Sequence, residues 1–473
     1  MRDKPDPKPG MDWDAFAHWG KQIADWGADY HRTLRDRPVR APLTPGTTRA
    51  QLPQILPETG TDMGAILADL DAQIMPGLTH WQHPRFFAYF PANAAPPSML
   101  AEFVTAILAP QCMLWQTSPA ATELEGVMLD WLRQALGLPE GFTGVIQDSA
   151  SSATLAAVLV MRERALDWAG NRVGLAAQPR LRIYASPEVH SSIDRAIWIA
   201  GIGAENLVRI PVTGPNRSMD AGALRAAIAT DRVAGMLPAG VIACTGATGV
   251  GACDDLRAVL GVARDEGLFS HVDAAWAGAA MICPENRVLW EGIEQADSLV
   301  LNPHKWLGVQ FDCSTHYLRD PAALVKTLAI APEYLRTHGA EGFVNYSEWS
   351  IPLGRRFRAL KLWFVLRFYG LEGLREMIRD HIRWSRCLCE RLRADARFEI
   401  MSEPVLSLFS FRLRGVPEEA QLDYLTRINN DGRIYLTQTR LDGAMVIRFQ
   451  VGAFGATLAD VETAWDVLSE LAG

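Results

Sequence analysis

A lysine and a histidine lie close together directly after an apolar run. The stretch LVLNPHKWLG covers residues 299–308, and its polar residues Asn302, His304 and Lys305 follow a run typical of a buried strand. Lysine is almost never fully buried unless it is paired. A desolvated lysine loses its proton more readily and can then attack an aldehyde to form a Schiff base. Lys305 is therefore a candidate nucleophile.

Polar residues also follow four other apolar runs. Ser149 and Ser151 follow TGVIQ and lead into a helical stretch, where hydroxyls and free amides can bind an anion. Taken alone, these serines are explained better as simple N-caps. His190 follows LRIYAS, and Thr248 follows AGVIAC in a turn of small residues that a flat ligand can approach closely. Asp273 follows LFSHV directly, and a carboxylate at the end of such an apolar run needs a positive or hydrogen-bonding partner.

The chemical groups of pyridoxal 5′-phosphate (PLP) match these strand ends. A phosphate binds a helix N-terminus with hydroxyls, as Ser149 and Ser151 offer. A pyridinium nitrogen pairs with a carboxylate such as Asp273, and the ring needs a flat stacking partner such as His190. An aldehyde reacts with an amine such as Lys305. Each site is weak evidence by itself, but together the sites indicate PLP.

An α/β domain would bring these residues together. From about residue 96 to 310, short apolar runs alternate with helical stretches such as residues 152–168, which predicts a mainly parallel sheet. Ligands of such sheets bind beyond the carboxyl ends of the strands. We therefore expect the candidate residues to converge at one edge of the sheet.

The flanking regions differ in pattern. Large apolar residues recur at helical spacing between residues 11 and about 75. We expect a helical N-terminal segment over residues 1–95 that packs on a partner subunit, although packing on the same chain is equally allowed. A large PLP-binding domain is expected over 96–372. β-like runs near residues 406–415 and 443–452 predict a small α+β C-terminal domain over 373–473.

Composition excludes several classes of function. The formal net charge is −8, so the chain lacks the basic surface expected for binding nucleic acid or an anionic membrane. No apolar run approaches the length of a membrane span. The seven cysteines form no CxxC pair, and we expect a soluble cytoplasmic protein. His80 and His83 belong to no metal-binding motif, so no metal is expected.

Several longer segments resemble the aromatic L-amino-acid decarboxylase family, the group II PLP-dependent decarboxylases. These segments are VIQDSASSATL, HSSIDRA, HVDAAWAGAAMICPE, NPHKWLGVQFDCS and IPLGRRFRALKLWFVLRFYG. The resemblance runs from about residue 11 to the C-terminus. It implies the PLP-dependent transferase fold of type I, an α/β fold.

The resemblance also implies roles for individual residues. Lys305 would hold PLP, Asp273 would bind the pyridine nitrogen, His190 would stack on the ring and Thr248 would lie near it. Tyr334 matches the tyrosine of a mobile catalytic loop. The phosphate would be held by Ser149, Ala150, Ser151, Asn302 and His304.

A further group of residues is similar to the family's substrate pocket, although without this resemblance core packing would be the preferred explanation of its aromatic members. Members with aromatic substrates usually have threonine at the position of Ala92 and apolar or aromatic residues at those of Gln111 and Met113. These two positions are expected to reach the pocket across a dimer. Trp276 also replaces a common tyrosine. The pocket residues implied are Trp81, Tyr89, Phe90, Pro91, Ala92, Gln111 and Met113.

The resemblance implies conversion of an L-amino acid, expected to be aromatic, to its amine and CO2 through an external aldimine and a quinonoid. A homodimer with its active site at the subunit interface is also implied. Three alternatives stay open: a decarboxylase of a non-aromatic amino acid, an aromatic aldehyde synthase and an inactive PLP-fold binding subunit. Relatives with phenylalanine at the position of Tyr334 form aldehydes, so Tyr334 favours the amine.

Overall fold

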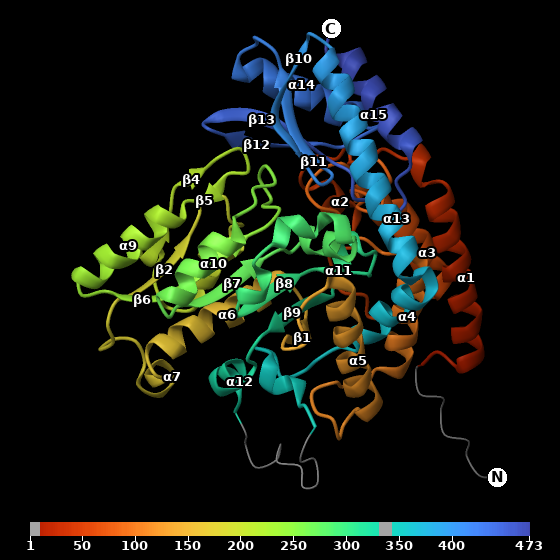
Figure 1. Cartoon of the computed structure of the whole chain (residues 1–473). Helices are drawn as coiled ribbons and strands as arrows, with labels where there is room; N and C mark the ends of the chain where they lie inside the picture. Colours follow the sequence, from red (N-terminus) through yellow and green to blue (C-terminus); the bar gives the residue numbers. More distant parts are fainter. Residues whose placement is uncertain (1–9, 331–342) are drawn as a thin grey trace, which may run out of the picture.

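A seven-stranded sheet forms the centre of the larger part of the molecule (Figure 1). The computed structural model describes residues 10–330 and 343–473. All five expected strands are present, and the expected mainly parallel sheet is confirmed, because only β9 runs antiparallel to its neighbours β8 and β1. In spatial order the strands are β1 (Thr143–Gln147), β9 (Ser314–Leu318), β8 (Ser298–Leu301), β7 (Phe269–Asp273), β6 (Leu237–Cys244), β2 (Leu181–Ala185) and β3 (Leu207–Arg209).

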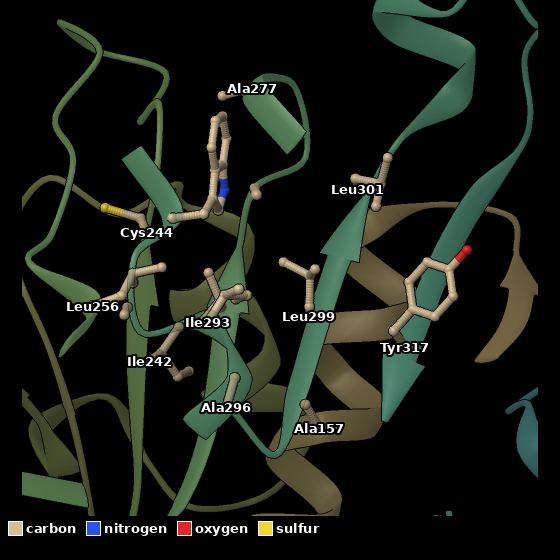
Figure 2. Close-up of a cluster of buried hydrophobic side chains, with 14 of the residues drawn as sticks. Ala157, Ile242, Cys244, Leu256, Ala277, Ile293, Ala296, Leu299, Leu301 and Tyr317 are labelled. Carbon is tan, nitrogen blue, oxygen red and sulfur yellow. The ribbon is translucent and has the colours of Figure 1, made fainter. Parts of the chain in front are cut away.

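Helices cover this sheet. Helix α6 (Ala150–Ala165) follows β1 and packs against β6, β7, β8 and β9. Figure 2 shows part of the core, a buried cluster that contains Ala157 of α6 together with Ile242, Leu299 and Tyr317 from three strands. Strands buried on both faces are nearly continuous apolar runs, which is why these strands stand out in the sequence. The other helices around the sheet are α5 (Pro119–Leu136), α7 (Ala169–Val173), α8 (Ser192–Ile199), α9 (Ala221–Val233), α10 (Leu256–Asp265) and α12 (Ala322–Leu328).

The N-terminal region is helical, as expected. Helix α1 (Trp13–Arg32) begins at Asp12, whose side chain accepts a hydrogen bond from Ala15 N, and lies along one edge of the molecule (Figure 1). None of its residues is buried within the chain. The shorter helices that follow are α2 (Thr47–Gln51), α3 (Met63–Asp69) and α4 (Pro96–Leu108).

A second, antiparallel sheet lies near the C-terminus, in the order β10–β11–β13–β12. The long helix α13 (Arg358–Ala394) leads into it and is interrupted at Gly370, where φ is +63°. The proposed domain boundary between residues 372 and 373 lies just after this interruption. The elements are β10 (Phe398–Val405), β11 (Leu408–Leu413), α14 (Glu418–Asp431), β12 (Thr437–Leu441), β13 (Ala444–Gln450) and α15 (Leu458–Leu471). None of the described helices has the length and apolar character needed to cross a bilayer.

Buried histidines inside the large sheet make the fold sensitive to acid. His316 on β9 is fully buried, and neither ring nitrogen has a hydrogen-bond partner among the described residues. Burial lowers its pKa to about 3. In the unfolded chain the pKa is about 6.5. Only the unfolded state therefore binds this proton between these values, and stability falls as the pH falls from about 6.5 toward 3.

Replacing His316 with leucine is expected to remove this penalty. Between pH 7 and pH 5 the variant should lose about 2 kcal/mol less unfolding free energy than the wild type, which follows from about 1.5 pH units at 1.36 kcal/mol each. Denaturant titrations at both pH values measure this difference. The exposed His18 offers a control for the loss of a histidine, since His18→Leu changes no buried group. Equal losses in His316→Leu and wild type would contradict the prediction.

Candidate active site

A cavity of about 170 Å³ lies at the carboxyl ends of the parallel strands. This is where the topology of an open α/β sheet places ligands. Nine of the residues singled out in the sequence line it: Phe90, Ser149, Ala150, Ser151, His190, Thr248, Asp273, Asn302 and Lys305.

The N-terminus of α6 forms one end of the cavity. Ser149 is the N-cap residue, and its hydroxyl accepts a hydrogen bond of 3.2 Å from Ser152 N. The capping interpretation of this serine is therefore confirmed. Because Ser149, Ala150 and Ser151 also line the cavity, the same residues present the positive end of a 16-residue helix to it. Such an end favours a bound anion.

Lys305 is presented by a one-turn helix, α11 (Pro303–Trp306), that follows β8. Its Nζ lies 5.5 Å from the centroid of the Phe90 ring. Burial lowers the pKa of Lys305, and the opposing effect of the Asp273 carboxylate does not reverse the shift. A lowered pKa favours the neutral amine, which is the form that attacks a carbonyl.

Asp273 and His190 are two further titratable groups around the cavity. Asp273 ends β7 and is only 9% exposed, and its Oδ1 accepts a hydrogen bond of 3.0 Å from Ala275 N. His190 follows β2, and its Nδ1 accepts a hydrogen bond of 3.1 Å from Ser192 N. The imidazole proton is therefore on Nε2. Burial lowers the pKa of His190, which favours the neutral form of the ring.

The turn after β6 needs a glycine at position 246. Gly246 has a φ of +73°, and a Cβ there would lie 2.4 Å from Ala277 Cβ and 3.2 Å from the Trp276 ring. Glycine at position 246 is therefore required by the backbone conformation and the close packing of this turn, which carries Thr248 into the cavity wall.

These groups fit PLP. The cavity offers a helix N-terminus for the phosphate and a carboxylate for the ring nitrogen. It also offers a neutral imidazole for the ring face and an amine of lowered pKa for the aldehyde. Asn302 adds an amide that is 4% exposed, and its Oδ1 has no hydrogen-bond partner within residues 10–330 and 343–473. A buried polar atom of this kind indicates that the protein atoms alone do not complete the site.

Two further residues were predicted from the sequence to belong to the site. His304 is not among the residues that line the cavity; its Nδ1 accepts a hydrogen bond of 3.0 Å from Cys313 N, and burial lowers its pKa to about 3. Tyr334 lies outside the described residues.

Of the expected substrate-pocket residues, only Phe90 lines this cavity. The Phe90 ring stacks on Trp276 with centroids 4.3 Å apart, and Trp276 stacks in turn on Trp306 at 4.9 Å. Trp81 is 42% exposed and stacks on Tyr89 at 5.7 Å.

The remaining pocket candidates occupy other places in the chain. Pro91 is buried, and the carbonyl of Ala92 accepts a hydrogen bond of 2.5 Å from Gln82 Nε2. Gln111 lines a separate groove, where its Oε1 accepts a hydrogen bond of 2.7 Å from Arg355 N. The carbonyl of Met113 accepts one of 3.0 Å from Ser347 N.

Several residues of the cavity wall were not identified from the sequence. Trp276 was noted only as a departure from a family pattern, whereas its ring forms part of the wall. The small residues before Thr248 gave a usable signal in the TGATG motif. Cys244, Ala275 and Ser192 carry no comparable signal, because their types are common in any strand end or turn.

Residues 45–414 match the model of the pyridoxal-dependent decarboxylase conserved domain. The chain belongs to the pyridoxal-dependent decarboxylase family. The expected family, type I fold and PLP cofactor are thereby confirmed.

Individual members of the family resemble the chain over nearly its whole length. It is 42% identical to the aromatic-L-amino-acid decarboxylase of Mus musculus, with 98% of each chain covered. It is 38% identical to the phenylacetaldehyde synthase of Arabidopsis thaliana, over 97% of this chain and 96% of the relative.

Solved structures of the family superimpose closely. The structure of Oryza sativa TDC with PLP and tryptamine has a TM-score of 0.94 at 32% identity, with 98% of each chain covered. The Catharanthus roseus tryptophan decarboxylase in complex with L-tryptophan has a TM-score of 0.92 at 33% identity, over 98% of this chain and 99% of that one.

Proposed function

We propose that this decarboxylase acts on aromatic L-amino acids and releases the amine and CO2. The observation that carries the proposal is the position of Lys305 Nζ in the cavity, 5.5 Å from the Phe90 ring and backed by the Phe90–Trp276 stack. A substrate amine that takes the place of Lys305 brings its own side chain near this aromatic wall. The names of the mouse and Catharanthus roseus relatives support the same substrate class.

When PLP is bound, its ring would act as an electron sink for the electrons of the bond between the α-carbon and the carboxylate of the substrate. Lys305 would hold the cofactor through its amine. Asp273 would keep a proton on the ring nitrogen, and the flat ring of His190 would fix the orientation of the cofactor. We assign the phosphate to Ser149, Ala150, Ser151 and Asn302, which line the cavity, with Thr248 beside the ring and Tyr334 as the proton donor.

A second candidate is an aromatic aldehyde synthase. The likeness to the Arabidopsis thaliana phenylacetaldehyde synthase favours it, as does a TM-score of 0.91 to the Rhodiola rosea 4-hydroxyphenylacetaldehyde synthase at 34% identity. Tyr334 favours the amine product instead, since a tyrosine at this position is typical of the amine-forming members.

A substrate panel tests the function. We expect the purified, yellow holoenzyme to release CO2 and amine in equal amounts from at least one of L-phenylalanine, L-tyrosine, L-tryptophan and L-DOPA, without hydrogen peroxide. L-Glutamate and L-leucine serve as non-aromatic controls. Aldehyde with peroxide would instead establish the second candidate. Turnover of a control alone would contradict the aromatic assignment, and a colourless, inactive protein would indicate a binding subunit.

We propose a homodimer whose active site lies at the subunit interface. Helix α4 exposes Leu100, Phe103, Ile107 and Leu108, between 47% and 62% each, and Phe103 stacks on Phe16 of α1. Apolar patches of this kind usually mark an interface. A partner seated here would place the α4 region, and with it Gln111 and Met113, near the other subunit. Sedimentation velocity at micromolar concentration should give a dimer, and a monomer would contradict the proposal.

We also propose a cytoplasmic location. All seven cysteines are free, and six of them are buried. Free thiols in this number fit a reducing compartment.

A further inference from the structure

The short helix that carries Lys305 cannot satisfy its own carbonyl groups. The last four carbonyls of any α-helix lack partners within the helix, and α11 has only four residues. Two of these carbonyls are bound by one distant residue. Asn93 donates its backbone N–H to His304 O at 2.8 Å, and its side-chain Nδ2 donates to Lys305 O.

The same asparagine also binds the chain near its C-terminus. Its Nδ2 donates a second hydrogen bond, of 2.7 Å, to Gly452 O, and its Oδ1 accepts one of 2.8 Å from Phe454 N. Asn93 is 1% exposed, so water does not compete for these groups. Both side-chain donors and the side-chain acceptor are therefore engaged, and they join α11 to the segment after β13.

Further contacts fix the positions of residues 90–95, of α11 and of the segment after β13 relative to one another. Ala95 N donates to Gly308 O at 2.8 Å. Gly308 has a φ of +75°, and a Cβ there would lie 2.4 Å from the Phe454 ring. Phe90, three residues before Asn93, lies 5.5 Å from Lys305 Nζ. Residues 90–95 thus contact Lys305 at its carbonyl and again at its amine.

We propose that Asn93 is a positioning residue that sets the place of Lys305 in the cavity. The inference rests on the proposed function, in which Lys305 holds the cofactor. Loss of the amide leaves Lys305 O, Gly452 O and Phe454 N without their partner and lets α11 move relative to the sheet. A displacement of about 1 Å can lower the rate of a catalysed reaction by about a hundredfold.

Asn93→Ala tests the proposal in the holoenzyme. We expect kcat to fall at least about tenfold. In the absence of substrate, we also expect a shift in the pH at which the bound cofactor changes its absorbance, because Lys305 Nζ has moved relative to its neighbours. Asn93→Asp keeps the shape and the acceptor but loses both donors, and should show the same two effects if the alanine variant fails to fold.

Asn429→Ala is the matched control. Asn429, on α14, makes two hydrogen bonds to the backbone of Leu436, of 3.1 and 3.0 Å, inside the C-terminal part. It should lower the melting temperature while keeping kcat within about twofold of wild type and the absorbance titration unchanged, because it does not touch α11.

Two outcomes would overturn the proposal: wild-type kcat in a folded Asn93 variant, or a loss accompanied by an unchanged absorbance titration, which would indicate a structural role only. A wild-type enzyme that binds PLP but decarboxylates no aromatic amino acid would overturn the proposed function instead. The absorbance measurement would still test Asn93, since it needs no substrate.

Discussion

Lys305→Ala is expected to abolish both turnover and the absorbance band of the bound cofactor at about 420 nm. Lys305 is the lysine whose amine reaches the cavity, and burial already lowers its pKa. Alanine leaves the cavity without an amine that can bind the aldehyde. Spectra of the purified variant and CO2 release from the aromatic panel measure the two effects.

Lys326→Ala provides the control for this substitution. Lys326 is an exposed lysine whose Nζ lies 3.6 Å from the ring centroid of Trp168, away from the cavity. Its removal should leave both the band and the turnover at wild-type values. If Lys305→Ala kept the band and the activity, Lys305 would lose its assigned role.

Arg355→Met is expected to lower the unfolding free energy by about 3–5 kcal/mol, the cost of breaking a buried ion pair. The guanidinium pairs with both carboxylate oxygens of Glu125, at 2.6 and 3.1 Å, and donates 2.8 Å and 3.2 Å hydrogen bonds to Ile146 O and Cys112 O. Both side chains are almost completely buried. The variant leaves the Glu125 carboxylate without a counter-charge in the interior.

Urea denaturation of three variants separates this effect from a general loss of charge. The double variant Arg355→Met with Glu125→Leu should recover part of the lost stability, because no unpaired charge remains. Arg440→Met breaks an exposed pair with Glu418 and should cost less than about 1 kcal/mol. A cost for Arg355→Met as small as that for Arg440→Met would show that the buried pair contributes little.

The strands that the sequence predicts differ in pattern from those that it does not. β6 and β8 are almost continuous apolar runs because both faces are buried. β9 has the sequence STHYL, and all five residues are buried although three are polar, so its pattern indicates no strand. The strands β10 and β12 are partly exposed and mix charged with apolar residues.

The site could be predicted where chemistry follows a strand. Lys305, Asp273 and His190 each lie at or within a few residues of the end of an apolar run, and parallel strands bring such positions to one edge. Asn93 has no comparable signal, because its partners are 212, 359 and 361 residues away and no local pattern encodes them. The groove that Gln111 lines could not be predicted from the sequence either, because residues 354–358 form it together with the end of α4 and the residues that follow α4.

The hydrogen bonds of Asn93 also bear on the biosynthesis of the enzyme. Gly452 and Phe454 are translated after every strand of the large sheet, and Asn93 joins them to the helix of Lys305. N-terminal parts of a protein generally fold first while the ribosome is still translating. The large sheet can therefore form before residues 452–454 have been made, but the lysine reaches its final position only once they are in place. We expect capture of the cofactor in its active geometry to follow formation of the sheet.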